Sequence, residues 1–155
     1  MAKRHHENWC LFLFYMTSYG DVLHFRRCQT NNMGRLRVLL AVSHPLFRQA
    51  ILGVLETMHQ VRIVGKVADG WDVLRTSARV KPDILLVDFS LPGLNGLEVT
   101  GLIRRELPKT LVIILLDEEN EKYIKAVEQS GAWAHLAKSQ LAQELPSLLS
   151  KLGQT

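Results

Sequence analysis

The sequence predicts an α/β domain built around a buried parallel sheet. From residue 35 onward, short and almost continuously apolar runs alternate with segments whose apolar residues recur at helical spacing. Unbroken apolar strands are typical of parallel sheets that are covered on both faces, and the alternation is typical of strand-helix-strand units. With 155 residues, 47% of them hydrophobic, the chain is long enough for one such domain.

The apolar runs give the expected strands, and the first helix lies between the first two of them. There, seven apolar residues from Leu46 to Met58 recur at helical spacing. Pro45 falls in the first turn, where a missing N–H costs nothing. The expected strands cover residues 37–42, 62–68, 83–88, 110–116 and 132–137.

The second and third helices are marked by their ends. The second is expected over about residues 70–80, because Pro82 disfavours helical geometry at Lys81. The third is expected to begin near Asn95, since Glu98 follows three residues later in the arrangement of a capping box.

The fourth and fifth helices complete the alternation. The fourth is expected over about residues 118–130 and ends at Gly131, because glycine readily adopts the left-handed conformation found at helix C-termini. Pro146 falls inside the fifth, so we expect that helix to be kinked or to start late. The fifth helix also carries an apolar stripe, which we assign first to the core and second to the surface of a homodimer: Leu141, Leu145, Leu148 and Leu152.

Residues 1–34 are expected to form an N-terminal extension, disordered or outside the native protein, ahead of a domain at residues 35–155. Residues 1–37 hold six basic and two acidic side chains, which is the entire net charge of +4. The rest of the chain is therefore neutral, and its charge gives no reason to assign nucleic-acid binding to the domain. Translation that starts at Met33 is a hypothesis that would remove residues 1–32 from the native chain.

The same extension bears on the cellular compartment. Cys10 and Cys28 lie in it without the spacing of metal ligands, which fits a reducing compartment, and we expect a cytoplasmic protein. The apolar run at residues 9–16 is too short to span a membrane, and no signal-peptide cleavage site follows it. We therefore expect no contact with a membrane.

The most informative segment is LLVDFSLPGLNGLEV, at residues 85–99, which ends an apolar strand on Asp88 and continues into a Pro-Gly turn. The segment HPLFRQ follows the first strand, and a Gly-Ala pair precedes Lys138 after the fourth helix. In this order, the motifs resemble the receiver domain of bacterial response regulators, and HPLFRQ is most similar to the NarL/FixJ branch. The resemblance implies a doubly wound, flavodoxin-like sheet of five parallel strands in the order 2-1-3-4-5, with the site at the carboxyl ends of the strands.

The resemblance also implies a chemistry. Receivers take a phosphoryl group from a histidine kinase onto an aspartate with the help of Mg²⁺. Asp88 matches the phosphoacceptor, and Lys138 matches the lysine that pairs with the carboxylate and the phosphate. Mg²⁺ would be held by Asp88, by one or two acids after the first strand, and by the backbone carbonyl of Ser90. Metal and lysine are needed because a carboxylate attacks an anionic phosphoryl group poorly without them.

The sequence departs from this pattern at four positions. Val42 and Ser43 stand where the acid pair would hold Mg²⁺, so we expect a steep loss of affinity for the metal. Leu116 replaces the small hydroxyl residue that would bind a phosphoryl oxygen, and His135 occupies the aromatic switch position in the fifth strand. Both ends of the relay that reports phosphorylation are therefore expected to be impaired.

Several of these residues have a purely structural alternative. Asp117 and Glu118 would replace lost negative charge or mimic a phosphoryl group, but we favour a solvated acidic loop. Ser43 is expected to cap the first helix rather than to bind metal, and His44 to be a helix-start residue. Whether Asp88 is a phosphoacceptor or only a strand-end carboxylate in an ion pair stays open.

Two functions are consistent with the sequence. The first is a stand-alone atypical receiver that is not an enzyme and acts through contact with a histidine kinase or another signalling protein. The second is a phosphoacceptor switch that still takes a phosphoryl group on Asp88. A cofactor-binding enzyme is disfavoured because no glycine-rich loop follows the first strand. The chain ends at Thr155, just beyond the fifth helix, so we expect no DNA-binding domain in it.

Overall fold

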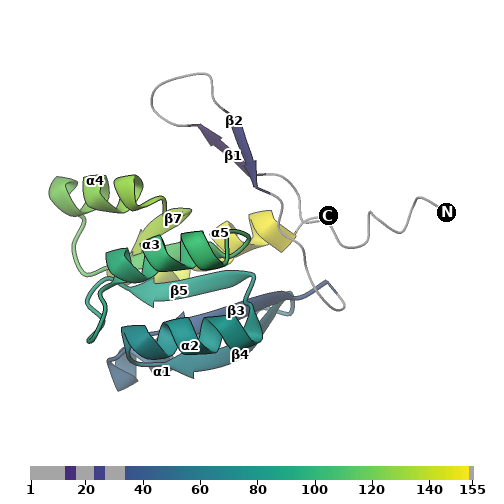
Figure 1. The fold of residues 1–155 in the computed structure, drawn as a ribbon. Helices are drawn as coiled ribbons and strands as arrows, with labels where there is room; N and C mark the ends of the chain where they lie inside the picture. Colours follow the sequence, from purple (N-terminus) through teal and green to yellow (C-terminus); the bar gives the residue numbers. More distant parts are fainter. Residues whose placement is uncertain (1–12, 17–22, 27–33, 154–155) are drawn as a thin grey trace.

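A five-stranded parallel sheet forms the centre of the domain in this computed structural model, which describes residues 13–16, 23–26 and 34–153 (Figure 1). Its strands are β3 (Leu36–Ala41), β4 (Val61–Val67), β5 (Ile84–Asp88), β6 (Leu111–Leu116) and β7 (Ala134–Ala137). They lie side by side in the order β4-β3-β5-β6-β7. Numbered from β3, this is the predicted order 2-1-3-4-5, and each expected strand is present with its ends within two residues of the prediction.

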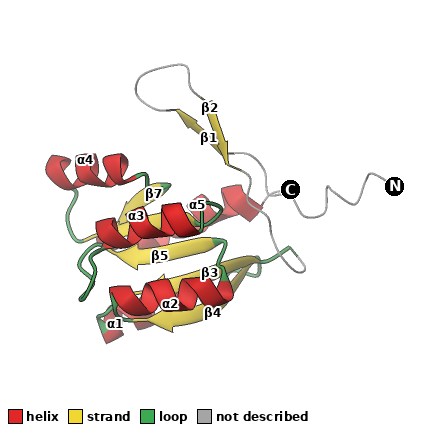
Figure 2. Ribbon diagram, in the orientation of Figure 1, coloured by secondary structure: helices red, strands yellow, loops and turns green. Residues whose placement is uncertain are grey.

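Helices cover both faces of the sheet (Figure 2). They are α1 (Pro45–Glu56), α2 (Gly70–Val80), α3 (Gly96–Glu106), α4 (Glu121–Ser130) and α5 (Leu141–Gly153), and a 3-10 turn, η2 (Lys138–Gln140), leads into α5. Each face of the sheet packs against its helices through its own apolar cluster. The helices α1 and α5 contribute to one cluster, and α2, α3 and α4 contribute to the other. Figure 1 shows α2 and α3 in front of the sheet, with α1 and α5 behind it.

The strands supply both clusters because successive side chains of a strand point to opposite faces. In β3, Val38 and Leu40 pack with α1 and α5, whereas Leu39 and Ala41 pack with the helices of the other face. All four side chains are fully buried. The predicted doubly wound architecture is therefore confirmed.

Most helix ends follow their sequence signals. Asn95 caps α3 with a complete capping box, in which its side chain accepts from the backbone N–H of Glu98 and the Glu98 carboxylate accepts from the N–H of Asn95. Gly131 ends α4 in the left-handed conformation, with φ of 80°. Lys81 ends α2 in the same conformation, immediately before Pro82 as predicted.

Two expectations about helix starts were wrong. The residue that caps α1 is His44, whose Nδ1 accepts from the backbone N–H of Phe47, and not Ser43. The helix α4 begins at Glu121, three residues later than expected, because the side chain of Asn120 caps it by accepting from the N–H of Lys122. A strong cap so close to the expected start decides where the helix begins.

Helix α5 also departs from the prediction in two details. It runs from Leu141 through Pro146 to Gly153, so of the two expected effects of the proline a late start is excluded, and the kink stays a prediction. Its buried stripe includes Leu149, whereas Leu148 is only partly buried against the cluster. The stripe lies in the core, as the first of the two assignments stated.

The N-terminal part contains two short antiparallel strands, β1 (Leu13–Met16) and β2 (Leu23–Arg26), with Leu13 opposite Arg26. Cys10, Cys28 and Met33 lie outside the described residues, so the expectations about them stay predictions. Within the described ranges, no helix combines the length and apolar character needed to cross a bilayer.

Candidate functional site

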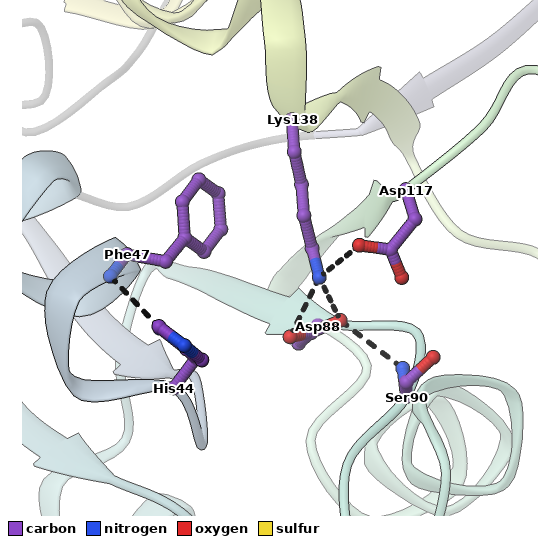
Figure 3. Close-up of polar contacts among 6 residues, drawn as sticks. All are labelled: His44, Phe47, Asp88, Ser90, Asp117 and Lys138. Atoms are coloured by element: carbon purple, nitrogen blue, oxygen red, sulfur yellow. Dashed lines mark hydrogen bonds and ion pairs between the residues drawn. The ribbon is translucent and has the colours of Figure 1, made fainter.

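The candidate site lies at the carboxyl edge of the sheet, where parallel strands bring their last residues together. Asp88 is the last residue of β5, and its residue surface is only 2% exposed. Lys138 follows β7 directly, and Asp117 follows β6. Figure 3 shows the side chains of these three residues pointing toward one another.

Asp88 and Lys138 form a close ion pair, which is the contact the sequence suggested. The Nζ atom of Lys138 lies 2.9 Å from Oδ1 of Asp88 and 3.0 Å from Oδ2. Oδ1 also accepts a hydrogen bond of 3.1 Å from the backbone N–H of Ser90. Both carboxylate oxygens therefore have a donor, which is why this acid tolerates burial.

Asp117 binds the same lysine, which the expectation of a purely solvated loop did not include. Its Oδ1 lies 2.8 Å from Nζ of Lys138, while its side chain is 63% exposed. Burial alone lowers the pKa of Lys138, but the hydrogen bonds and charges of Asp117 and Asp88 outweigh that effect and raise its pKa above the ordinary value. The lysine is therefore held as a cation between two carboxylates.

Phe47 contributes to the site from the opposite side. The Nζ atom of Lys138 lies 5.2 Å from the centroid of its ring, within the range of a cation–π contact. The ring comes from α1, whose start is set by the cap on His44. The sequence indicated Phe47 only as a core residue, because helical spacing does not show which end of a helix faces a neighbouring strand end.

The side chains of Val42 and Leu116 are buried in the apolar core. Val42 is fully buried in the cluster with α1 and α5, and Leu116 is 1% exposed in the cluster on the other face. The backbone carbonyl of Val42 accepts a 3.0 Å hydrogen bond from the guanidinium of Arg48. Ser43 is half-buried and offers only a neutral hydroxyl.

These residues do not fit Mg²⁺. The ion needs several hard oxygen ligands in octahedral geometry, and carboxylates supply them best. At this edge, the Asp88 carboxylate is already bound to a cation on both oxygens, and positions 42 and 43 supply no acid. Across the described residues, no group of three or more His, Cys, Asp or Glu side chains is arranged to hold a metal.

His135 lies apart from the ion pair. It is half-buried in β7, opposite Ile114 of β6 in the parallel register. It lines a cavity of about 250 Å³ together with residues of α4 and of the segment before β7. No hydrogen bond or ion pair between His135 and Asp88 or Lys138 is present in the part of the chain that the structure describes.

Relatives of known sequence have the same domain. Residues 38–150 match the family model of the response regulator receiver domain. The chain is 32% identical over 114 residues to the uncharacterized transcriptional regulatory protein YxjL of Bacillus subtilis, covering 74% of this chain and 52% of YxjL. It is 30% identical over 110 residues to the transcriptional regulatory protein LiaR of the same organism, covering 71% and 52% of the two chains. It thus spans about half the length of these curated relatives.

Solved structures agree with the sequence relatives. The signal receiver domain of the putative response regulator NarL from Mycobacterium tuberculosis superposes with a TM-score of 0.72 at 28% identity, covering 77% of this chain and 96% of that domain. The RcsB receiver domain from Escherichia coli, solved in its non-phosphorylated form, gives a TM-score of 0.72 at 25% identity, covering 76% and 92%. From the sheet order, the Asp88–Lys138 pair and the match over residues 38–150, the chain belongs to the response regulator receiver domain family.

Proposed function

We propose that this chain is an atypical receiver that works through protein–protein interaction, with the metal-dependent phosphorylation of Asp88 weakened or absent. One observation carries the proposal. The side chains of Val42 and Leu116 lie in the apolar core, at the two positions where the chemistry of the family needs oxygen atoms. A buried valine or leucine can neither bind a metal nor donate a hydrogen bond to a phosphoryl oxygen.

The charge balance of the site supports the proposal. A phosphoryl group brings negative charge to a carboxylate, and catalysis of its transfer depends on cations that neutralise this charge. Here, the one cation within hydrogen-bonding distance of Asp88 among the described residues is Lys138, and that lysine is shared with Asp117. The site is therefore poor in positive charge at the point where the reaction would need it.

A histidine kinase or another signalling protein is the partner that this proposal implies. A candidate contact for this partner is Leu46, which precedes the site residue Phe47 in the first turn of α1 and is 72% exposed. The conformation of the domain would then be set by the bound protein and not by phosphate. A cytoplasmic location of the protein is part of the same proposal.

The second candidate function is a phosphoacceptor switch at Asp88, and the geometry of the ion pair favours it. Lys138 lies where it could bind an oxygen of a phosphoryl group on Asp88. In that reaction, an oxygen of the Asp88 carboxylate would form a bond to phosphorus while the bond between phosphorus and the donor breaks. The leaving group would keep the electron pair of the broken bond.

Intact-mass spectrometry separates the two functions. The full chain would be incubated with a small-molecule phosphodonor and millimolar Mg²⁺, with Asp88→Asn as the control. We expect little or no phosphoryl adduct on the unaltered chain and none on the variant, because the site lacks the ligands that recruit the metal. A phosphoryl adduct on most of the unaltered chain that is absent from the Asp88→Asn variant would contradict the proposal and establish the switch.

A further inference from the structure

We propose that Asp117 is a built-in anionic ligand of Lys138, and that it tethers the loop between β6 and α4 to the site without a phosphoryl group. Asp117 would thus be a positioning residue that acts through Lys138. The inference deepens the proposed function, since a loop that is fixed in this way has no need of phosphorylation to become ordered.

The number of donors on the lysine is the first argument. A lysine ammonium carries three N–H donors and no acceptor. Three carboxylate oxygens surround Nζ of Lys138: both oxygens of Asp88, at 2.9 and 3.0 Å, and Oδ1 of Asp117, at 2.8 Å. Two of these contacts are hydrogen bonds, to Oδ2 of Asp88 and to Oδ1 of Asp117, and the third is an ion-pair contact, so the ammonium is shared between the two carboxylates. A phosphoryl oxygen on Asp88 would compete with these carboxylates for Lys138, and the exposed Asp117 is the one that can move into water.

The second argument is the path of the chain. Leu116, the last residue of β6, pairs in register with Ala137, which directly precedes Lys138. Asp117 and Lys138 are therefore the next residues on two adjacent parallel strands, and this register places their side chains together. Asn120 caps α4 only three residues after Asp117. The segment 117–120 is thus held at its start by the ion pair and at its end by the helix cap.

The third argument is that no other contact among the described residues explains how the loop between β6 and α4 is held. Tyr123 of α4 packs against Phe89 with ring centroids 5.1 Å apart, so an aromatic contact also holds this region near β5. That contact involves α4 itself and not the residues before its cap. The adjacent acid, Glu118, is exposed and has no ion pair or hydrogen bond with Lys138 in the described part of the chain. Glu118 is therefore a matched control for Asp117, because it carries the same charge in the same loop without the contact to Lys138.

Amide hydrogen exchange of the full chain, without metal or phosphodonor, tests the tether. Asp117→Ala would be compared with Glu118→Ala, which removes an equal charge one residue further along. We expect Asp117→Ala to speed exchange over residues 117–120 by about two- to fivefold, the effect of losing an ion pair with one exposed partner. Glu118→Ala should leave the exchange unchanged. In an NMR titration of the Lys138 ammonium, only Asp117→Ala should lower the pKa, because it removes a carboxylate that stabilises the charged form.

Two results would overturn the inference: unchanged exchange and an unchanged Lys138 pKa in Asp117→Ala, or equal effects of the two variants. The second would mean that only the total charge of the loop matters. The outcome is independent of the phosphodonor experiment. Phosphorylation of Asp88 on most of the chain would contradict the proposed function and leave the tether standing, whereas equal exchange in the two variants would remove the tether and leave the proposed function untouched.

Discussion

Two buried carboxylates lie at opposite ends of β5 and have different partners. Asp88, at the carboxyl end, is paired with the cation Lys138. Asp83, just before the strand, is 7% exposed, and Oδ2 accepts a 2.8 Å hydrogen bond from the backbone N–H of Arg37. Burial raises the pKa of Asp83 to about 6, and the N–H and charge of Arg37 lower it by less. A single neutral donor does not replace the hydration that this acid loses.

This environment predicts how stability depends on pH. The ordinary pKa of Asp83 is 3.8 and the folded value is about 6, so the folded protein binds the proton more tightly than the unfolded chain does. The stability due to this group is therefore fully present below pH 3.8 and is lost as pH rises to about 6. Asp83→Asn keeps an oxygen that can accept from Arg37 but carries no charge.

We expect the free energy of unfolding of Asp83→Asn, relative to the unaltered protein, to increase by up to about 3 kcal/mol between pH 4 and pH 7. Urea unfolding at several pH values measures this difference, and other titrating groups cancel because both proteins carry them. Parallel stability profiles for the two proteins would show that Asp83 does not titrate in this range.

At the scale of single side chains, the sequence predicts some of the site residues but not all of their contacts. Asp88 and Lys138 were identified by their motifs, and the structure brings them into contact. The contact of Asp117 with Lys138 is not among the predictions from the sequence, because an exposed acid before a helix is ordinarily explained by the helix dipole. The helix cap is His44 and not Ser43, because His44 has the extended backbone that directly precedes the helix and its side chain accepts from the N–H of Phe47. Residue type alone favoured serine.

At the scale of elements, α3 is docked directly on the end of the strand that carries Asp88. A Cβ atom on Gly96, the first residue of α3, would lie 2.9 Å from the carbonyl oxygen of Asp88 and 3.0 Å from Cα of Phe89. The backbone N–H of Gly96 donates to the carbonyl of Phe89 at 2.9 Å. The helix start and the strand end are thus packed backbone against backbone.

This packing predicts opposite effects for two alanine substitutions in α3. Gly96→Ala should lower the free energy of unfolding by about 1–3 kcal/mol, because the methyl group forces backbone atoms apart. Gly101→Ala should raise it by up to about 1 kcal/mol, because alanine is the better helix former. At Gly101, the added Cβ meets nothing within 4 Å. Denaturant unfolding of the two variants checks the prediction. Equal changes in the free energy of unfolding would mean that the backbone contact of α3 with β5 can relax to accommodate a methyl group.

Element ends were predicted well where one local signal was unopposed, and poorly where two competed. The capping box of Asn95 and Glu98 gave the start of α3, and Gly131 gave the end of α4. The sequence predicts the start of α4 three residues too early, because the acids from Asp117 onward resemble the first turn of a helix. The actual start is set by Asn120, whose side-chain cap competes with that signal.

For the whole molecule, the distribution of oxygen ligands predicts the response to metal. A ligand that binds the folded state raises stability appreciably only when its concentration reaches or exceeds its dissociation constant. We expect millimolar Mg²⁺ to raise the melting temperature by less than about 2 °C. Ser43→Asp, which returns one acid to the carboxyl edge of β3, should show a larger rise in the same thermal-shift measurement. A rise of several degrees in the unaltered protein would reveal a metal site.

The sequence by itself determined the family, the order of the elements and the position of the carboxylate Asp88. Periodicity and turn residues are local properties, and the receiver motifs are contiguous segments, so both can be identified without the fold. The tertiary structure decided which groups surround Lys138. Asp88 ends β5, Asp117 lies in the loop after β6, and Phe47 lies on α1, and the three meet at one ammonium group. Their contact depends on the strand register and on how α1 packs against the sheet, which no local pattern encodes.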